Sequence, residues 1–72
     1  MLANVDFNIT EHIFSLQSSG AFTKELNKVS WNGREPVYDL RGWNEDHTKM
    51  TKGITLTNDE FKEFVSKLKE EL

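Results

Sequence analysis

Aromatic and basic side chains alternate over the middle of this 72-residue chain. Bases of a single nucleic-acid strand stack on aromatic rings while cations hold the phosphates, and each stacked base contributes about 1–3 kcal/mol. The pattern therefore predicts a nucleic-acid-binding face, with a core position as an equal alternative for either tryptophan taken alone. The groups are Phe22 with Lys24, Lys28 with Trp31, Arg41 with Trp43, and Lys49 with Lys52.

Each basic residue also has an interpretation without function. Arg41 could pair with Asp39 or with a cross-strand acid, and Lys49 and Lys52 could protect an exposed strand edge from aggregation. Asp46-His47 is more typical of a solvated turn than of a catalytic or metal-binding pair. Nucleic-acid binding is therefore inferred from the group of residues rather than from one of them.

The chain lacks the residue sets of common enzymes. It has no cysteine, no Gly-rich phosphate loop, and no Ser-His-Asp set with suitable spacing, while His12 and His47 are far apart in the sequence. A domain this small with an open sheet face also rarely encloses a substrate pocket. We expect a protein that is not an enzyme and that uses neither a metal nor a cofactor.

A helix is predicted at the C-terminal end. Thr57-Asn58-Asp59-Glu60 has the form of a capping box, in which the Thr and Glu side chains satisfy backbone N–H groups at a helix start. The apolar residues that follow share a stripe about 100° wide, which we expect to be buried. They are Phe61, Phe64, Val65, Leu68 and Leu72.

Four strands are predicted before this helix: Ile9 to Gln17, Thr23 to Trp31, Val37 to Trp43, and a shorter one from Gly53 to Leu56. Turn-forming residues separate them, beginning with Ser18-Ser19-Gly20. The order indicates an α+β fold in which residues 1–72 form one domain, a curved four-stranded antiparallel sheet followed by the helix. Alternation in the third strand places Leu40 beneath the helix, and Arg41 and Trp43 on the opposite, open face.

Size and charge limit how such a chain can work. A core this small gives roughly 3–5 kcal/mol of stability, and without disulfides or zinc, oligomerisation is the remaining support. The net charge of −3 argues against coating nucleic acid by bulk charge alone. Residues 1–6 show no signal peptide, and no segment approaches the roughly 20 apolar residues of a membrane span. A cytoplasmic protein is expected.

Three longer strings occur in a characteristic order: Trp31-Asn32-Gly33, Tyr38-Asp39-Leu40-Arg41-Gly42-Trp43, and Lys49-Met50-Thr51-Lys52-Gly53-Ile54-Thr55-Leu56-Thr57. From about Lys24 to Leu68 the chain resembles the YdbC-like bacterial family. That family is similar to the single-strand-binding domain of the eukaryotic transcriptional coactivator called positive cofactor four.

The resemblance implies a homodimer, formed through the helices and the adjoining sheet, that binds single-stranded DNA with little sequence preference and could act in transcription, replication or repair. Phe61, Phe64, Val65 and Leu68 become core and dimer contacts. The resemblance places the nucleic-acid contacts at Lys24, Lys28, Trp31, Arg41, Trp43, Lys49 and Lys52, to which Phe22 is added from its position. A protein-interaction module and a binder of single-stranded RNA are the alternatives.

Overall fold

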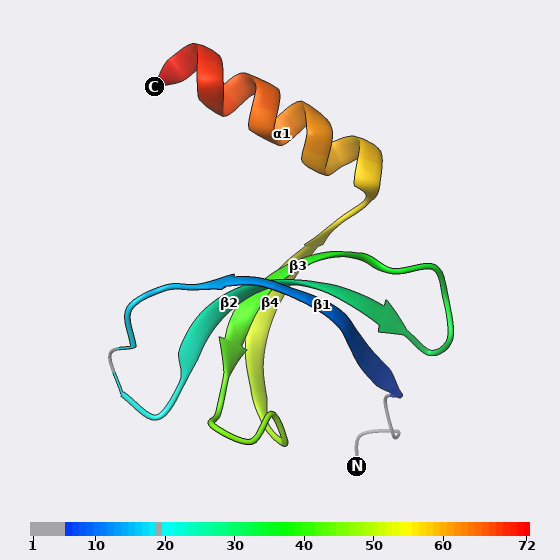
Figure 1. The fold of residues 1–72 in the computed structure, drawn as a ribbon, viewed down its shortest axis with the longest axis vertical. Coiled ribbons are helices and arrows are strands. Elements are labelled where there is room, and N and C mark those ends of the chain that lie inside the picture. Colours follow the sequence, from blue (N-terminus) through cyan, green and yellow to red (C-terminus); the bar gives the residue numbers. More distant parts are fainter. Residues whose placement is uncertain (1–5, 19) are drawn as a thin grey trace.

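The computed structural model describes residues 6–18 and 20–72, so residues 1–5 and the predicted turn residue Ser19 lie outside the described part. Four strands form one antiparallel sheet in the order β1-β2-β3-β4, and one helix follows (Figure 1). The predicted α+β order is confirmed. The elements are β1 (Phe7–Ser15), β2 (Thr23–Trp31), β3 (Val37–Trp43), β4 (Met50–Leu56) and α1 (Asn58–Glu71).

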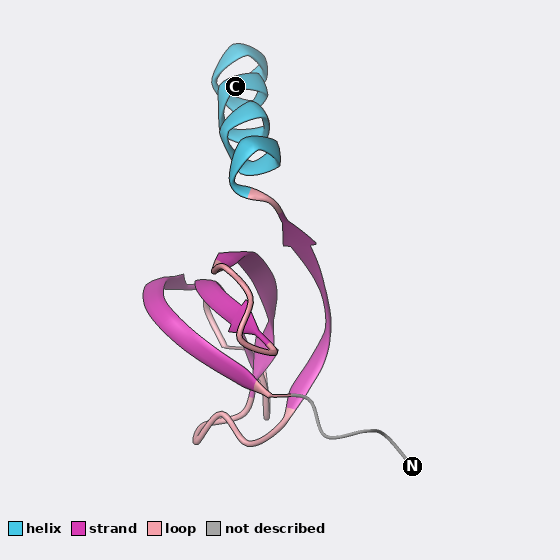
Figure 2. Ribbon diagram, turned by 90° about the vertical axis from the view of Figure 1, so that its right-hand side faces the viewer, coloured by secondary structure: helices cyan, strands magenta, loops and turns pink. Residues whose placement is uncertain are grey.

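The sheet is strongly curved (Figure 2). β1 shifts register against β2 between Ile9 and Glu11 and again between His12 and Phe14, and a further shift lies between β3 and β4. Such bulges bend a strand and increase its twist. As a result, the rings of Phe7 on β1 and Trp43 on β3 lie 5.1 Å apart, although these two strands are not neighbours in the sheet.

The core lies on the concave side of the sheet, defined here by Glu25, Asn27, Val29 and Trp43. Val29 and Trp43 are 0% and 1% exposed, and Asn27 is also fully buried. Alternate residues of a strand share a side, so Glu25, Asn27 and Val29 of β2 all point to this face. The sheet therefore encloses its core by curving over it, without a second layer of structure.

The capping box predicted for the helix is present. The Thr57 hydroxyl accepts a hydrogen bond from the Glu60 backbone N–H at 3.0 Å, and the Glu60 carboxylate accepts one from the Thr57 N–H at 2.8 Å. The helix touches the sheet mainly through Phe61, whose ring stacks on Tyr38 at 3.7 Å between ring centroids. Across residues 6–18 and 20–72, no helix is long and apolar enough to cross a membrane.

The prediction that the apolar helix stripe is buried is wrong for a single chain. No residue of α1 is buried, and Phe64 and Leu68 are 50% and 41% exposed. The physical reason is that α1 leaves the end of β4 at the margin of the sheet, so it meets the convex side only over its first turns (Figure 1). Burial of this apolar stripe therefore requires contact with another molecule.

Gly53 marks a close approach between β3 and β4. It lies opposite Arg41, and an added Cβ would stand 2.5 Å from the Leu40 carbonyl oxygen and nearer still to the Arg41 Cβ.

We expect Gly53→Ala to lower the free energy of unfolding by about 1–3 kcal/mol, because the backbone and the Arg41 side chain must both shift. Urea unfolding measures this. Ser66→Ala, at an exposed helix position, should stay within about 0.5 kcal/mol; an equal effect of the two changes would contradict the close approach.

Candidate nucleic-acid interface

Trp31 stands at the end of β2, on the concave side. The Arg41 guanidinium carbon lies 4.8 Å from the centre of its ring, and the Phe7 ring lies 6.0 Å away on another side. Trp31 is partly exposed, while its indole Nε1 is buried without a hydrogen-bond partner in the described part of the chain. A cation–π contact and an aromatic neighbour thus hold in place a ring on which a base could stack.

Arg41 is committed to a carboxylate. Its Nε and Nη2 donate to the two oxygens of Asp39 at 2.7 and 2.8 Å, and Asp39, which is 1% exposed, also accepts a hydrogen bond from the Thr55 hydroxyl at 2.8 Å. A buried carboxylate needs such partners, because its desolvation is otherwise strongly unfavourable. The pairing of Arg41 with Asp39, an alternative left open by the sequence, is therefore present, with the carboxylate buried and the guanidinium partly exposed.

Trp43 does not form an exposed platform, and that prediction is wrong. Alternation places Trp43 on the same side as Arg41, as expected. However, the curvature brings the rings of Phe7 and His47 to 5.1 and 5.4 Å from the Trp43 ring, and only 1% of the residue is exposed. Trp43 therefore belongs to the core and offers almost no surface to a ligand.

A cluster of His12, Glu25, Asn27 and His47 occupies the other end of the concave side. His47 Nε2 lies 3.0 Å from both oxygens of Glu25, whose Oε1 also accepts from Asn27 Nδ2 at 3.1 Å. His12 Nδ1 lies 2.7 Å from Asn27 Oδ1 and 3.6 Å from Glu25 Oε1. Together with Ile9, these four residues line a cavity of about 200 Å³.

Sequence reasoning missed this cluster. It interpreted Asp46-His47 as a solvated turn, whereas the His47 side chain packs on Trp43 and binds Glu25, 22 residues earlier in the chain. The backbone of His47 has a φ of 59°, a left-handed conformation that few residues adopt. Nothing in the local pattern signals such a contact.

The pKa of Glu25 lies below its ordinary value. Burial by itself raises it, but the hydrogen bonds from His47 and Asn27 and the nearby charges of His47 and His12 outweigh the burial. The carboxylate form is thus stabilised in the folded protein.

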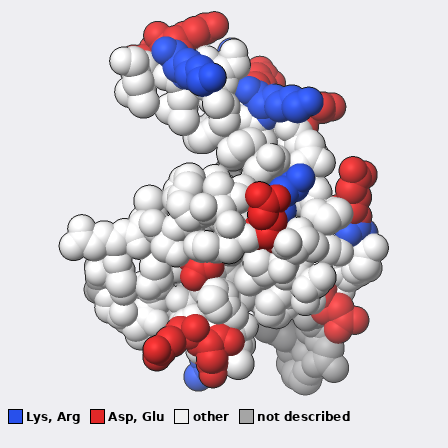
Figure 3. All heavy atoms as spheres, in the orientation of Figure 1, with Lys and Arg blue, Asp and Glu red and all other residues white. Residues whose placement is uncertain are grey.

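The lysines predicted to bind phosphates lie elsewhere. Lys28 faces the convex side, with Nζ 5.2 Å from the centre of the Tyr38 ring. Lys24 is exposed beside Phe22, in a cavity of about 280 Å³ that Gly42 and Thr51 also line. Lys49 and Lys52 are exposed, and on the face in Figure 3 basic groups are scattered among acidic ones. The eight predicted residues therefore do not form one continuous surface.

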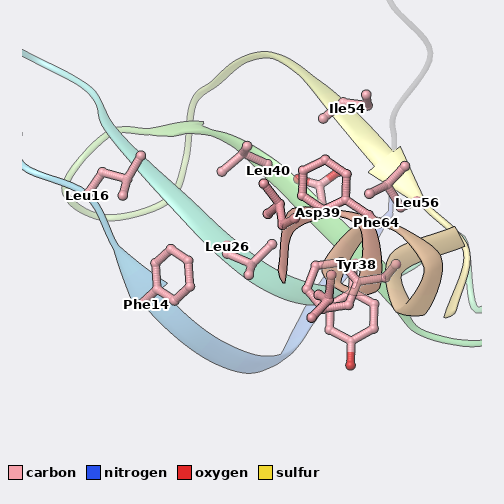
Figure 4. A pocket seen from close by; sticks show the side chains of 12 residues that line it. Phe14, Leu16, Leu26, Tyr38, Asp39, Leu40, Ile54, Leu56 and Phe64 are labelled. Carbon is pink, nitrogen blue, oxygen red and sulfur yellow. The ribbon is translucent and has the colours of Figure 1, made fainter. Parts of the chain in front are cut away.

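An apolar groove separates the convex side of the sheet from α1. It has a volume of about 420 Å³ and is lined almost entirely by apolar side chains that point toward one another from the sheet and the helix (Figure 4). Leu40 faces it as predicted, yet it remains 37% exposed. Its other lining residues include Phe14, Leu26, Ile54, Phe64 and Leu68.

A metal centre is not formed by the part of the chain that the structure describes, because no three of its His, Asp or Glu side chains are placed to hold one ion. This holds for the histidine cluster on the concave side as well.

The region from β2 into α1 matches a known protein family. Residues 22–67 match the family model described as transcriptional coactivator p15 (PC4), and this range includes β2, β3, β4 and most of α1. A protein of Treponema pallidum (strain Nichols), described only as uncharacterized, is 44% identical over 62 residues, which cover 82% of this chain and 73% of that protein.

The lowered pKa of Glu25 predicts an acid-sensitive contribution to stability. A carboxyl group whose pKa is lower in the folded than in the unfolded state stabilises the fold above its unfolded value, and this contribution is lost as the pH falls through the folded value. Between pH 6 and pH 3, we therefore expect the unfolding free energy of the wild type to fall further than that of Glu25→Gln. Urea unfolding at several pH values measures this. Glu35→Gln, at an exposed site, should follow the wild type; an equal loss in Glu25→Gln would contradict the prediction.

Proposed function

The chain belongs to the family of the transcriptional coactivator p15 (PC4), and from this we propose that it binds single-stranded DNA with little sequence preference. The match over residues 22–67 is the observation that carries the proposal, because it includes three of the four strands and the helix start. A role in transcription, replication or repair is part of the same proposal.

Trp31 is the best-supported base platform of this site. The residue is partly exposed, and contacts with Arg41 and Phe7 hold its ring at the end of β2. Since Arg41 is paired with Asp39, it contributes little free positive charge. We assign phosphate binding mainly to exposed lysines at the margins of the sheet, namely Lys24, Lys49 and Lys52, with Lys28 and Phe22 as further contacts.

The proposed working form is a homodimer assembled over the apolar groove. Isolated helices shorter than about 12–15 residues are marginal in water, and α1 has 14 residues with half of its apolar stripe exposed. A second copy offers the matching surface, because each chain presents both a groove and an apolar helix stripe on the same side. In a twofold pair the same patch can then cover itself. Another protein filling the groove is the competing interpretation.

Binding is tested with a labelled oligothymidylate of about 20 nucleotides and a duplex of equal length, at low and moderate salt. We expect the single strand to bind more tightly than the duplex, with a log–log salt slope near −0.7 for each phosphate contacted. Anisotropy of the label measures both quantities. No binding, or equal binding of strand and duplex, would exclude the proposal, and an oligouridylate run in parallel tests the RNA alternative.

Substitutions distinguish the contribution of base stacking to affinity from that of phosphate binding by lysine. Trp31→Ala should weaken binding by about 1–3 kcal/mol for each base that stacks there, and Trp31→Phe should restore much of it. Lys24→Gln should instead make the salt slope shallower by about 0.7 if it removes one phosphate contact. Lys67→Gln is the matched control, because Lys67 lies on α1 beside Glu63, away from the sheet. Circular dichroism of each variant checks that the fold is kept.

The dimer is tested by sedimentation velocity over a range of concentrations. The wild type should sediment with twice the mass of one chain, and Phe64→Asp should dissociate the pair, because it places a charge in the apolar groove. Ile54→Asp, at a groove position that is 57% exposed in one chain, repeats the test with less risk to the fold. Ser66→Asp adds the same charge to the other face of α1 and should leave the dimer intact. A wild type that stays single-chain at tens of micromolar would exclude the homodimer.

A further inference from the structure

The histidine cluster shares the concave side with the proposed platform. On β2, Glu25, Asn27 and Trp31 are separated by even numbers of residues, so their side chains point to the same side. A row of neighbouring rings links the platform to the cluster: the Phe7 ring lies 6.0 Å from that of Trp31 and 5.1 Å from that of Trp43, which lies 5.4 Å from the His47 ring. A nucleic-acid strand that stacks on Trp31 could therefore reach the partly exposed imidazoles of His47 and His12 within a few nucleotides.

From this juxtaposition we infer that His12 and His47 make single-strand binding proton-linked, with an affinity that rises as the pH falls from 8 to 5.5. The inference rests on the proposed function, because it concerns the same surface and the same ligand. It adds a regulatory property, a charge on the binding face that depends on pH.

The exposure of the three ionisable groups suits this role. The side chains of His12 and His47 are 50% and 38% exposed, whereas that of Glu25 is 10% exposed. Charge that appears on the imidazoles thus faces a ligand, while the negative charge is shielded beneath them. With both histidines neutral the cluster carries one negative charge, and with both protonated it carries one positive charge.

The hydrogen bonds indicate where each added proton goes. Asn27 Nδ2 donates to Glu25, so Asn27 Oδ1 accepts from Nδ1–H of His12, which leaves His12 Nε2 to take the second proton beside the Ser15 hydroxyl at 3.2 Å. His47 Nε2–H donates to the Glu25 carboxylate, so His47 takes its second proton at Nδ1. Neither protonation breaks a bond to Glu25.

The other charged groups near the cluster are of types that ordinarily keep their charge between pH 5.5 and 8. They are Glu11 on β1, Lys28 beside it on β2, Asp39 and Arg41 on β3, and Glu45 and Asp46 in the loop that carries His47. Carboxyl, ammonium and guanidinium groups ordinarily titrate outside pH 5.5–8, whereas imidazole titrates within it. Hydrogen bonds from Thr48 also hold the pKa of Asp46 below its ordinary value. Of the side chains in and around the cluster, the imidazoles are the type that ordinarily changes charge in this range.

The test measures oligothymidylate affinity at four pH values from 5.5 to 8.0 and constant ionic strength, with a label whose emission does not depend on pH. Intrinsic fluorescence is unsuitable, because His47 lies against Trp43 and would alter its emission on protonation. Thymine is chosen since it does not protonate in this range. We expect tighter binding at pH 5.5 and a salt slope steeper by about 0.7–1.4, which corresponds to one or two added phosphate contacts.

The double variant His12→Gln/His47→Gln keeps hydrogen-bonding groups at both positions but cannot titrate, so its affinity should lose the dependence on pH. Lys49→Gln is the control for charge alone, because it should weaken binding at every pH and keep the wild-type pH profile. By reciprocity, adding the oligonucleotide should raise the pH at which the histidine NMR signals titrate in the wild type.

The outcomes separate the two proposals. A wild type that binds the single strand with a flat pH profile, or a double variant with the wild-type profile, would overturn the proton linkage and leave single-strand binding standing. Absence of single-strand binding at both pH 5.5 and pH 8.0 would overturn the proposed function itself. Circular dichroism and sedimentation at both extremes ensure that folding and assembly are unchanged across the series.

Discussion

The structure depends on one constraint: a single sheet without a covering layer must enclose its own core. Register shifts in β1 and between β3 and β4 let the sheet curve until Phe7 contacts Trp43 across the intervening strand. As a consequence, the concave and convex sides of the sheet differ in how far their apolar side chains are buried. The concave side closes over Val29 and Trp43, while apolar residues of the convex side, such as Ile54, remain exposed. The proposed single-strand binding uses the concave side, and the proposed dimer contact uses the exposed apolar residues of the convex side.

Closing the concave side also buries polar groups, which then require partners. Asp39 is satisfied by Arg41 and Thr55, and Glu25 by Asn27 and His47. Because breaking a buried ion pair is costly, Arg41 serves the fold before it serves a ligand. Part of Trp31 and the lysines around the sheet remain exposed, and these are the groups proposed to contact nucleic acid. A chain of net charge −3 can thus present cations locally, although the face in Figure 3 shows no broad basic surface.

Local signals in the sequence predicted what depends on local geometry. The capping box marked the start of α1, and turn residues and alternation gave the observed bounds of β2 and β3. Strand β4 begins three residues before its predicted start, where a register shift interrupts the pattern. Alternation correctly placed Arg41 and Trp43 on one side, but it cannot express curvature, so the burial of Trp43 was missed. The contact of His47 with Glu25 requires the folded loop and has no counterpart in sequence spacing.

The separation of the two sides constrains how assembly and binding can be coupled. Trp31, His12 and His47 do not line the convex groove, so a second copy that covers the groove and helix stripe leaves these side chains accessible in both chains. One flexible strand could then occupy both surfaces, and the second contact would benefit from the high effective concentration created by the first. Assembly would in that case raise affinity for long strands far more than for strands that reach one surface. Proton uptake at the two histidine clusters would add to both contacts, so the pH response should also grow with strand length.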